Sequence, residues 1–213
     1  MTGRAPEGQE FESHLEEDFF VLLRFNKNVV RWESHPLTIE WLDEQGRVRE
    51  YTPDVLVEYR PEKPVADPVM VLCEIKPDFD SMSDRPKNRL PRRESEAENK
   101  LKWEAAERYA ARKSWTFKVY REAEIRTPYL RNARFLMRFR ERPVSMHRHQ
   151  ELMDTLKAHK QLSLEDWVNP LVSTNAQRAD LLPTCYHLIA EGYVKVDLST
   201  LISLKSVCEY IDE

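Results

Sequence analysis

The chain has 213 residues, a third of them charged, and a formal net charge of −4. Its longest apolar runs, FFVLL and VMVLC, are much shorter than the roughly 20 residues of a membrane-spanning helix, and MTGRAPEGQEFES at the N-terminus lacks the apolar segment of a secretory signal. We therefore expect a cytoplasmic protein that does not contact a membrane. Charges of both signs leave nucleic acid possible as a partner.

The first 142 residues predict an α/β domain. Apolar residues at helical spacing, from Phe11 to Leu23, predict an amphipathic helix over residues 10–25. Three runs rich in β-branched and aromatic residues predict an antiparallel meander: LTIEWL (37–42), RVREYTPDVLVEY (47–59) and VMVLCEIK (69–76). After them we expect a basic loop (78–93), a helix (about 94–113), a fourth strand (115–121) and a second basic helix (129–142).

A domain boundary is predicted near Pro143, which makes residues 143–213 a second domain. Its pattern predicts three helices and then a strand, with Pro183 interrupting the third helix: MHRHQELMDTLKAH, LSLEDWVNPL, NAQRADLLPTCYHLIAEG and YVKVDL. Three short helices followed by a β element favour a small winged-helix-like module. The three cysteines form no CxxC pair, so neither a disulfide framework nor a zinc site is indicated.

Acidic residues stand at the ends of two strands that are otherwise apolar. If residues 60–68 form a symmetric loop, Tyr59 faces Val69 and Asp54 faces Glu74. Directly opposed residues on one sheet face have Cβ atoms about 4.5 to 5.5 Å apart. Because side chains alternate along a strand, Lys76 shares the face of Glu74, whereas Ile75 points to the core.

Two interpretations of these charges remain open. Opposed carboxylates repel unless a cation or a proton lies between them, and oxygen ligands suit Mg²⁺ or Mn²⁺. With the ammonium of Lys76 alongside, this arrangement fits phosphodiester hydrolysis. In the alternative, Asp54 only ends a strand after Pro53, and Glu74 and Lys76 form a solvated edge.

Glu16 also has two interpretations. The sequence Ser13-His14-Leu15-Glu16 fits a capping box, in which Glu16 closes the first turn of a helix. Alternatively, because Phe11 already belongs to the apolar stripe, the helix begins earlier and leaves Glu16 free to face the sheet.

Basic residues follow the acidic strand end. We expect them to contact DNA phosphates near the carboxylates, although a solvated loop is the alternative for most of them. They are Arg85, Lys87, Arg89, Arg92, Arg93 and Lys100. A further basic surface, for DNA or a partner, is predicted on the helix over 129–142.

The motifs TPD and EIK match the PD-(D/E)xK pattern of restriction-endonuclease-like nucleases. Together with SHLEEDFFVLLRFNKNVVRWESHPLTIEW, ENKLKWEAAERYAARKSWTFKVYREAEIR and YLRNARFL, the chain resembles the N-terminal domain of TnsA, the endonuclease subunit of heteromeric transposases. The resemblance implies a restriction-endonuclease-like core. It also implies that Asp54, Glu74 and the Ile75 carbonyl bind metal and that Lys76 is the catalytic lysine. By the same resemblance, Glu16 completes the site as a further metal ligand carried by the helix.

By the same resemblance, the protein is expected to cut the 5′ ends of a transposon in double-stranded DNA with Mg²⁺, for which Mn²⁺ substitutes. Its implied partners are a TnsB-type transposase and a TnsC-type AAA+ ATPase, contacted through a winged-helix-like C-terminal domain. A free-standing nuclease of restriction or repair, and a non-catalytic DNA-binding scaffold, are the alternative functions.

Overall fold

The computed structural model describes residues 3–4, 8–61, 63, 66–78 and 96–212. The chain divides into two compact units, Met1–Ile125 and Arg126–Glu213. In the described part of the chain, no helix combines the length and the apolar character needed to cross a membrane.

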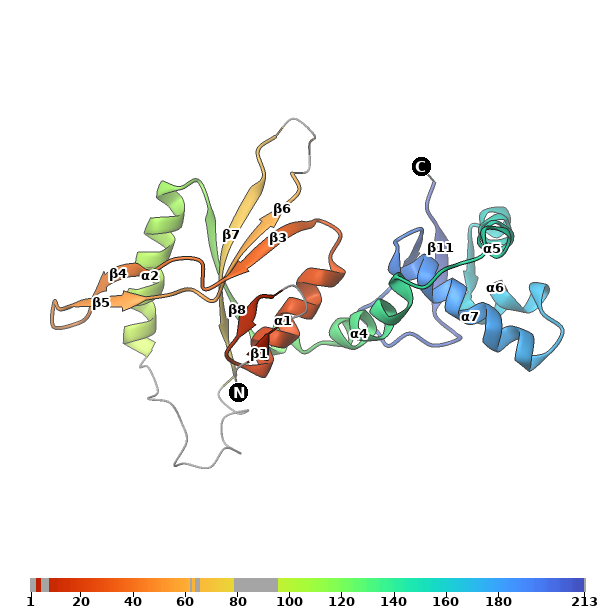
Figure 1. Cartoon of the computed structure of the whole chain (residues 1–213), viewed down its shortest axis with the longest axis horizontal. Helices are drawn as coiled ribbons and strands as arrows, with labels where there is room; N and C mark the ends of the chain where they lie inside the picture. The colour runs from red at the N-terminus through yellow and green to blue at the C-terminus, as the bar shows by residue number, and fades with distance from the viewer. Residues whose placement is uncertain (1–2, 5–7, 62, 64–65, 79–95, 213) are drawn as a thin grey trace, which may run out of the picture. The chain divides into compact units, whose positions relative to one another are not determined.

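The N-terminal unit is built around a four-stranded sheet in the order β3-β6-β7-β8 (Figure 1). Its elements are β1 (Gly3–Arg4), β2 (Glu10–Phe11), α1 (His14–Phe25), β3 (Val29–Ser34), β4 (Ile39–Leu42), β5 (Val48–Tyr51), β6 (Val55–Tyr59), β7 (Val69–Lys76), α2 (Glu96–Arg112), β8 (Thr116–Arg121) and α3 (Glu122–Ile125). Strands β3, β6 and β7 are antiparallel neighbours, and β8 runs parallel to β7. This mixed α/β arrangement fits the predicted restriction-endonuclease-like core.

Alternation along the central strands gives the sheet two buried faces. Val55, Val57, Cys73 and Ile75 pack with the apolar side of α1 in one core cluster. On the other face, Leu72 packs with alanines of α2 and with residues of β4 and β5 in a second cluster. Glu74 follows Cys73 in β7, so its side chain lies on the α2 face of the sheet.

The register between β6 and β7 is the predicted one, because Tyr59 pairs with Val69 and Val55 pairs with Cys73. The strand predicted over 37–42 is present as β4, but its predicted place in the meander was wrong. Strand β3 takes that place, whereas β4 pairs with β5 in a separate hairpin that lies beside α2 (Figure 1). The run predicted as one strand over 47–59 is divided after Tyr51, where Pro53 has no N–H to donate to a ladder.

Helix α1 begins at His14, with Ser13 as its N-cap, so the predicted start at residue 10 was also wrong. Phe11 lies in β2, which pairs with β1, and its ring still packs against the α1 core cluster. A residue outside the helix therefore contributed to the apolar pattern that predicted a longer helix.

The C-terminal unit combines helices with a three-stranded antiparallel sheet in the order β10-β11-β9. Its elements are α4 (Pro128–Arg140), α5 (Met146–His159), β9 (Gln161–Ser163), α6 (Leu164–Val168), η3 (Asn169–Leu171), α7 (Asn175–Ala190), β10 (Val194–Val196) and β11 (Val207–Tyr210). Trp167 is fully buried and donates its indole N–H to the carbonyl of Leu152 at 2.8 Å.

Pro183 does not interrupt α7, contrary to the prediction. A proline inside a helix removes the hydrogen bond to the carbonyl four residues earlier, which here belongs to Ala179. Because Ala179 is exposed, water can satisfy that carbonyl, and the helix continues to Ala190.

Helix α4 belongs to the C-terminal unit, so the division comes earlier than the predicted boundary near Pro143. The buried side chain of Asn132 donates to the carbonyls of Leu198 (2.9 Å) and Thr200 (2.6 Å) and accepts from the N–H of Ile202 (3.1 Å). These contacts join residues far apart in sequence, and no local pattern predicts them.

Candidate active site

The site lies where β6 begins and β7 ends. Asp54 directly precedes β6, and its carboxylate oxygen Oδ2 accepts the backbone N–H of Ile75 at 2.6 Å. On its other side, the carbonyl of Asp54 accepts the N–H of His35 at 2.9 Å. Backbone groups of two neighbouring segments therefore fix the position of this aspartate.

Pro53 explains why the side chain of Asp54, and not the backbone, receives this N–H. The register between β6 and β7 puts Pro53 at the next ladder position opposite Ile75. Proline has no N–H to give to the Ile75 carbonyl, so the regular ladder stops there. The N–H and carbonyl of one residue face the same side of a strand, so the Ile75 carbonyl also faces the Asp54 side. This orientation suits the predicted backbone ligand.

Glu74 is almost completely buried, with 2% of its surface exposed, and protein groups contact both of its carboxylate oxygens. Oε1 lies 2.8 Å from the Nζ atom of Lys76 and 3.6 Å from the Nζ atom of Lys102. Oε2 accepts the hydroxyl hydrogen of Tyr51 at 2.6 Å. Glu74 and Lys76 thus lie together as predicted, and the interpretation of Glu74 as a solvated strand end was wrong.

The pKa of Asp54 is raised well above 3.8, the ordinary value for aspartate. Burial is the main cause, and the negative charges of Glu74 and Glu16 add to it. The Ile75 N–H and the Lys76 ammonium act in the opposite direction. A proton or a bound cation would offset the unfavourable negative charge of this carboxylate. Such surroundings are expected of a metal ligand.

Glu16 takes the capping interpretation. Its backbone N–H donates to the hydroxyl of Ser13 at 3.2 Å, and its Oε1 atom accepts from that hydroxyl at 2.7 Å. Oε2 accepts the N–H of Glu12 at 2.8 Å. The glutamate is nevertheless buried and contributes to the raised pKa of Asp54, so its charge acts on the site even though its oxygens bind the helix start.

Among the described residues, no three His, Cys, Asp or Glu side chains lie close enough together to form a metal centre. Two carboxylates are nonetheless a sufficient protein contribution for Mg²⁺, which usually keeps several waters and adds phosphate oxygens of the substrate. Asp54, Glu74 and the Ile75 carbonyl offer hard oxygen donors of this kind. The residues present therefore fit Mg²⁺ or Mn²⁺ as a partial, two-carboxylate site.

The predicted phosphate contacts at Arg85, Lys87, Arg89, Arg92 and Arg93 lie outside the described residues. Lys100 is exposed on α2, and its contact with DNA stays a prediction.

Sequence reasoning did not assign Tyr51 or Lys102 to the site. Tyr51 ends β5, a strand that was predicted to continue to residue 59, and the sequence around Lys102 does not distinguish a buried lysine from a solvated one. The small residues Ala105 and Ala106 on the buried face of α2 are the sequence signal for a close approach to the sheet.

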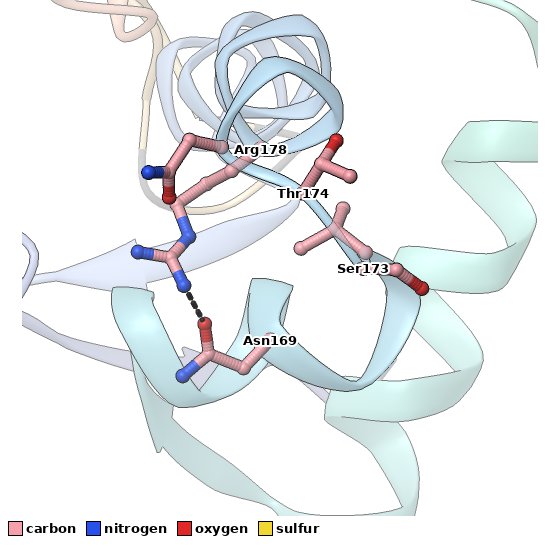
Figure 2. Close-up of a pocket in the computed structure, with 6 residues that line it drawn as sticks. Asn169, Ser173, Thr174 and Arg178 are labelled. Atoms are coloured by element: carbon pink, nitrogen blue, oxygen red, sulfur yellow. Dashed lines mark hydrogen bonds between the residues drawn. The ribbon is translucent and has the colours of Figure 1, made fainter.

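A surface pocket of about 460 Å³ lies elsewhere, in the C-terminal unit. Figure 2 shows its lining residues, four of them labelled, with Arg178 directed to Asn169, and the hydrogen bond between these two is 2.6 Å long. Arg178 also lies 3.8 Å from a carboxylate oxygen of Glu165. The pocket contains none of the predicted catalytic residues, so the carboxylate site remains the candidate catalytic centre.

The fold and the carboxylate–lysine set fit a restriction-endonuclease-like domain. Comparison with protein families narrows this class: residues 26–122 match the family described as TnsA-like endonuclease N terminal. Most of the N-terminal unit is therefore similar to a TnsA-like endonuclease domain. The match includes Asp54, Glu74 and Lys76, whereas Glu16 precedes it and the C-terminal unit follows it. No curated protein matches the chain.

Proposed function

We propose that this protein is the metal-dependent endonuclease subunit of a transposase and cuts the 5′ ends of the transposon in double-stranded DNA. The observation that carries the proposal is the buried Glu74 beside Asp54, with the Lys76 ammonium 2.8 Å from Glu74, inside a TnsA-like endonuclease domain. This set of groups has the residue types that phosphodiester hydrolysis requires.

Each residue has a distinct role in this proposal. Asp54 and Glu74, with the Ile75 carbonyl, hold Mg²⁺, and Mn²⁺ substitutes for it. The bound ion supplies an activated water and offsets negative charge on the phosphate. Lys76 stabilises the charge that develops on the phosphate and orients the attacking water. Glu16 assists through its negative charge beside Asp54 and needs no direct contact with the ion.

The C-terminal unit supports a role in assembly on DNA. The order α5, β9, α6, α7, β10 and β11, with β11 between its two partner strands, agrees with a winged-helix-like module. We propose that it contacts DNA and the partners, a TnsB-type transposase and a TnsC-type AAA+ ATPase, in the cytoplasm. Helix α4 supports a DNA contact, because its exposed face carries Arg131, Arg134 and Arg138.

Cleavage of a transposon-end substrate with Mg²⁺ tests this function. The assay is run with and without the TnsB-type and TnsC-type partners. We expect cutting at the 5′ ends that depends on the partners. Asp54→Ala and Lys76→Ala are expected to remove cutting while the protein keeps its circular dichroism spectrum and its thermal transition.

Other outcomes of the same assay identify the alternatives. Efficient cutting without partners indicates a free-standing nuclease. Absence of cutting, together with absence of Mn²⁺ binding by calorimetry, indicates a DNA-binding scaffold. Undiminished cutting by Asp54→Ala contradicts the assignment of the site.

A further inference from the structure

Lys102 is a buried cation in α2, and the other buried residues of this helix are alanines. It is 5% exposed and shares the buried side of α2 with Ala105, Ala106 and Ala110. Burial of an ammonium group is costly unless other groups compensate its charge. A lysine at this position therefore indicates that its positive charge has a structural or functional role.

The compensation for Lys102 comes from the nuclease site. Its Nζ atom lies 3.6 Å from Oε1 of Glu74 and 4.7 Å from the centroid of the Tyr51 ring. The hydroxyl of the same tyrosine donates to Oε2 of Glu74 at 2.6 Å. Helix α2 and strand β5 thus contribute one group each to hold the two oxygens of a single carboxylate.

Lys102 differs from Lys76, the other ammonium at Oε1. The side chain of Lys76 is 26% exposed and comes from the same strand as Glu74, whereas that of Lys102 is 6% exposed and comes from a helix across the sheet face. Lys76 can turn toward solvent or a phosphate without leaving its strand. Withdrawal of Lys102 from Glu74 would require repacking of α2, so its positive charge is fixed beside the carboxylate.

We propose that Lys102 is a positioning residue of this site with two effects. It holds Glu74 in place, and its fixed charge weakens the binding of a divalent cation to Asp54 and Glu74 in the free protein. The second effect follows because a cation that joins these carboxylates must approach a buried ammonium of the same sign. This inference rests on the proposed function and adds a residue that regulates metal affinity.

Calorimetric titration of the full chain with Mn²⁺ tests the inference without any cleavage step. Lys102→Met keeps much of the side-chain volume and removes the charge, so we expect Mn²⁺ to bind about tenfold more tightly than to the wild type. Lys102→Arg keeps the charge and is expected to bind Mn²⁺ like the wild type. Lys113→Met, at an exposed position beyond the end of α2, removes the same charge and serves as the matched control with unchanged affinity.

A purely structural role for Lys102 predicts a different result. In that case Lys102→Met lowers the melting temperature but leaves Mn²⁺ affinity unchanged or weaker, and the inference is wrong. If Lys102→Met does not fold, Lys102→Gln replaces it, because the amide still donates to Glu74 without a charge. For Gln as for Met, tighter Mn²⁺ binding supports the inference, and unchanged or weaker binding contradicts it.

Cleavage kinetics separate this inference from the proposed function. With Mg²⁺ at saturation, we expect Lys102→Met to lower kcat and leave KM for DNA nearly unchanged, because Glu74 is less well held while DNA contacts remain. If Asp54→Ala abolishes Mn²⁺ binding and Lys102→Met does not tighten it, only the role of Lys102 is refuted. If Asp54→Ala still binds Mn²⁺ and cuts DNA, the proposed function itself is refuted.

Discussion

Asp54 is a residue whose local interactions are favourable and whose electrostatic surroundings are not. It accepts the Ile75 N–H at 2.6 Å, yet burial and the charges of Glu74 and Glu16 raise its pKa well above 3.8. Sites of this kind reduce stability to gain function, because like charges are held together before their ligand arrives. The effect is measurable in the free protein.

Asp54→Asn is expected to stabilise the metal-free protein at pH 7 by about 1 kcal/mol, because it removes the buried charge while the amide oxygen still accepts from Ile75. Folded wild type binds the Asp54 proton more tightly than the unfolded chain, so this residue's contribution to stability declines as pH rises above 3.8. The advantage of the variant should therefore grow from acid to neutral pH in thermal denaturation. An equal melting temperature at every pH would contradict the placement of Asp54.

Mg²⁺ is expected to raise the melting temperature of the wild type and not that of Asp54→Asn. A ligand that binds only the folded state stabilises it in proportion to the logarithm of its concentration. Differential scanning fluorimetry over a range of Mg²⁺ concentrations measures this shift. The same measurement with Ca²⁺ at matched ionic strength shows whether the shift in melting temperature is specific to Mg²⁺ or arises from ionic strength alone.

The three cysteines lie in the cores and should be inert in the folded protein. Burial raises the pKa of Cys73 and of Cys208 to about 12 and that of Cys185 further. Because only thiolates react readily, we expect almost no reaction with a disulfide reagent at pH 8 until denaturant is added. Absorbance should then report three thiols per chain, and fast labelling of the native protein would show that a core opens.

At the scale of elements, the β4–β5 hairpin carries Tyr51 to the site. The hairpin is outside the main sheet, and its residues Ile39 and Tyr51 pack against α2. The sequence shows the strand pattern of this segment correctly but not its partner, because an alternating strand pairs equally well with any edge that buries its apolar face. Packing against α2 decided that β4 pairs with β5 and not with the main sheet.

Helix α4 has one buried and one basic face. Leu130, Ala133 and Leu136 are buried, and the arginines at 131, 134 and 138 are exposed at three- and four-residue spacing on the opposite side. The helix contains no acidic residue. Such a face matches the phosphate backbone of DNA, which requires positive charge without sequence-specific contacts.

Replacement of all three exposed arginines by glutamine should weaken DNA binding and reduce the slope of log affinity against log salt by about 0.9 for each phosphate that the variant no longer neutralises. Fluorescence anisotropy at several salt concentrations measures both quantities. Lys157→Gln, Lys160→Gln and Lys195→Gln, combined in one protein, remove the same charge elsewhere in the C-terminal unit and are the control. An equally large effect in both triple variants would contradict a specific role for α4, because positive charge elsewhere in the C-terminal unit would then attract DNA as strongly.

At the scale of the whole molecule, each unit has its own buried core. Leu188 is fully buried in the C-terminal unit, so Leu188→Ala is expected to destabilise that unit by about 2 to 5 kcal/mol. The shift of melting temperature with Mg²⁺ should persist in this variant, since the carboxylates belong to the other unit. Scanning calorimetry with and without Mg²⁺ checks both expectations, and loss of the Mg²⁺ shift would contradict them.

The sequence by itself determined the centre of the candidate site. The pairing of Tyr59 with Val69 followed from the assumption that residues 60–68 form a symmetric loop, and strand alternation then put Glu74 and Lys76 on one face. These relations are local, because a hairpin register and a two-residue period depend on neighbouring residues alone.

Only the tertiary structure decided which other groups reach Glu74. Tyr51 and Lys102 come from a separate hairpin and from a helix, and they meet at one carboxylate because α2 packs its alanines closely against the sheet. The place of α4 in the C-terminal unit was decided in the same way. A local sequence pattern is compatible with several long-range contacts, and burial and packing determine which of them form. The contacts of a charged residue are hardest to predict, because it does not belong to the periodic pattern of apolar residues.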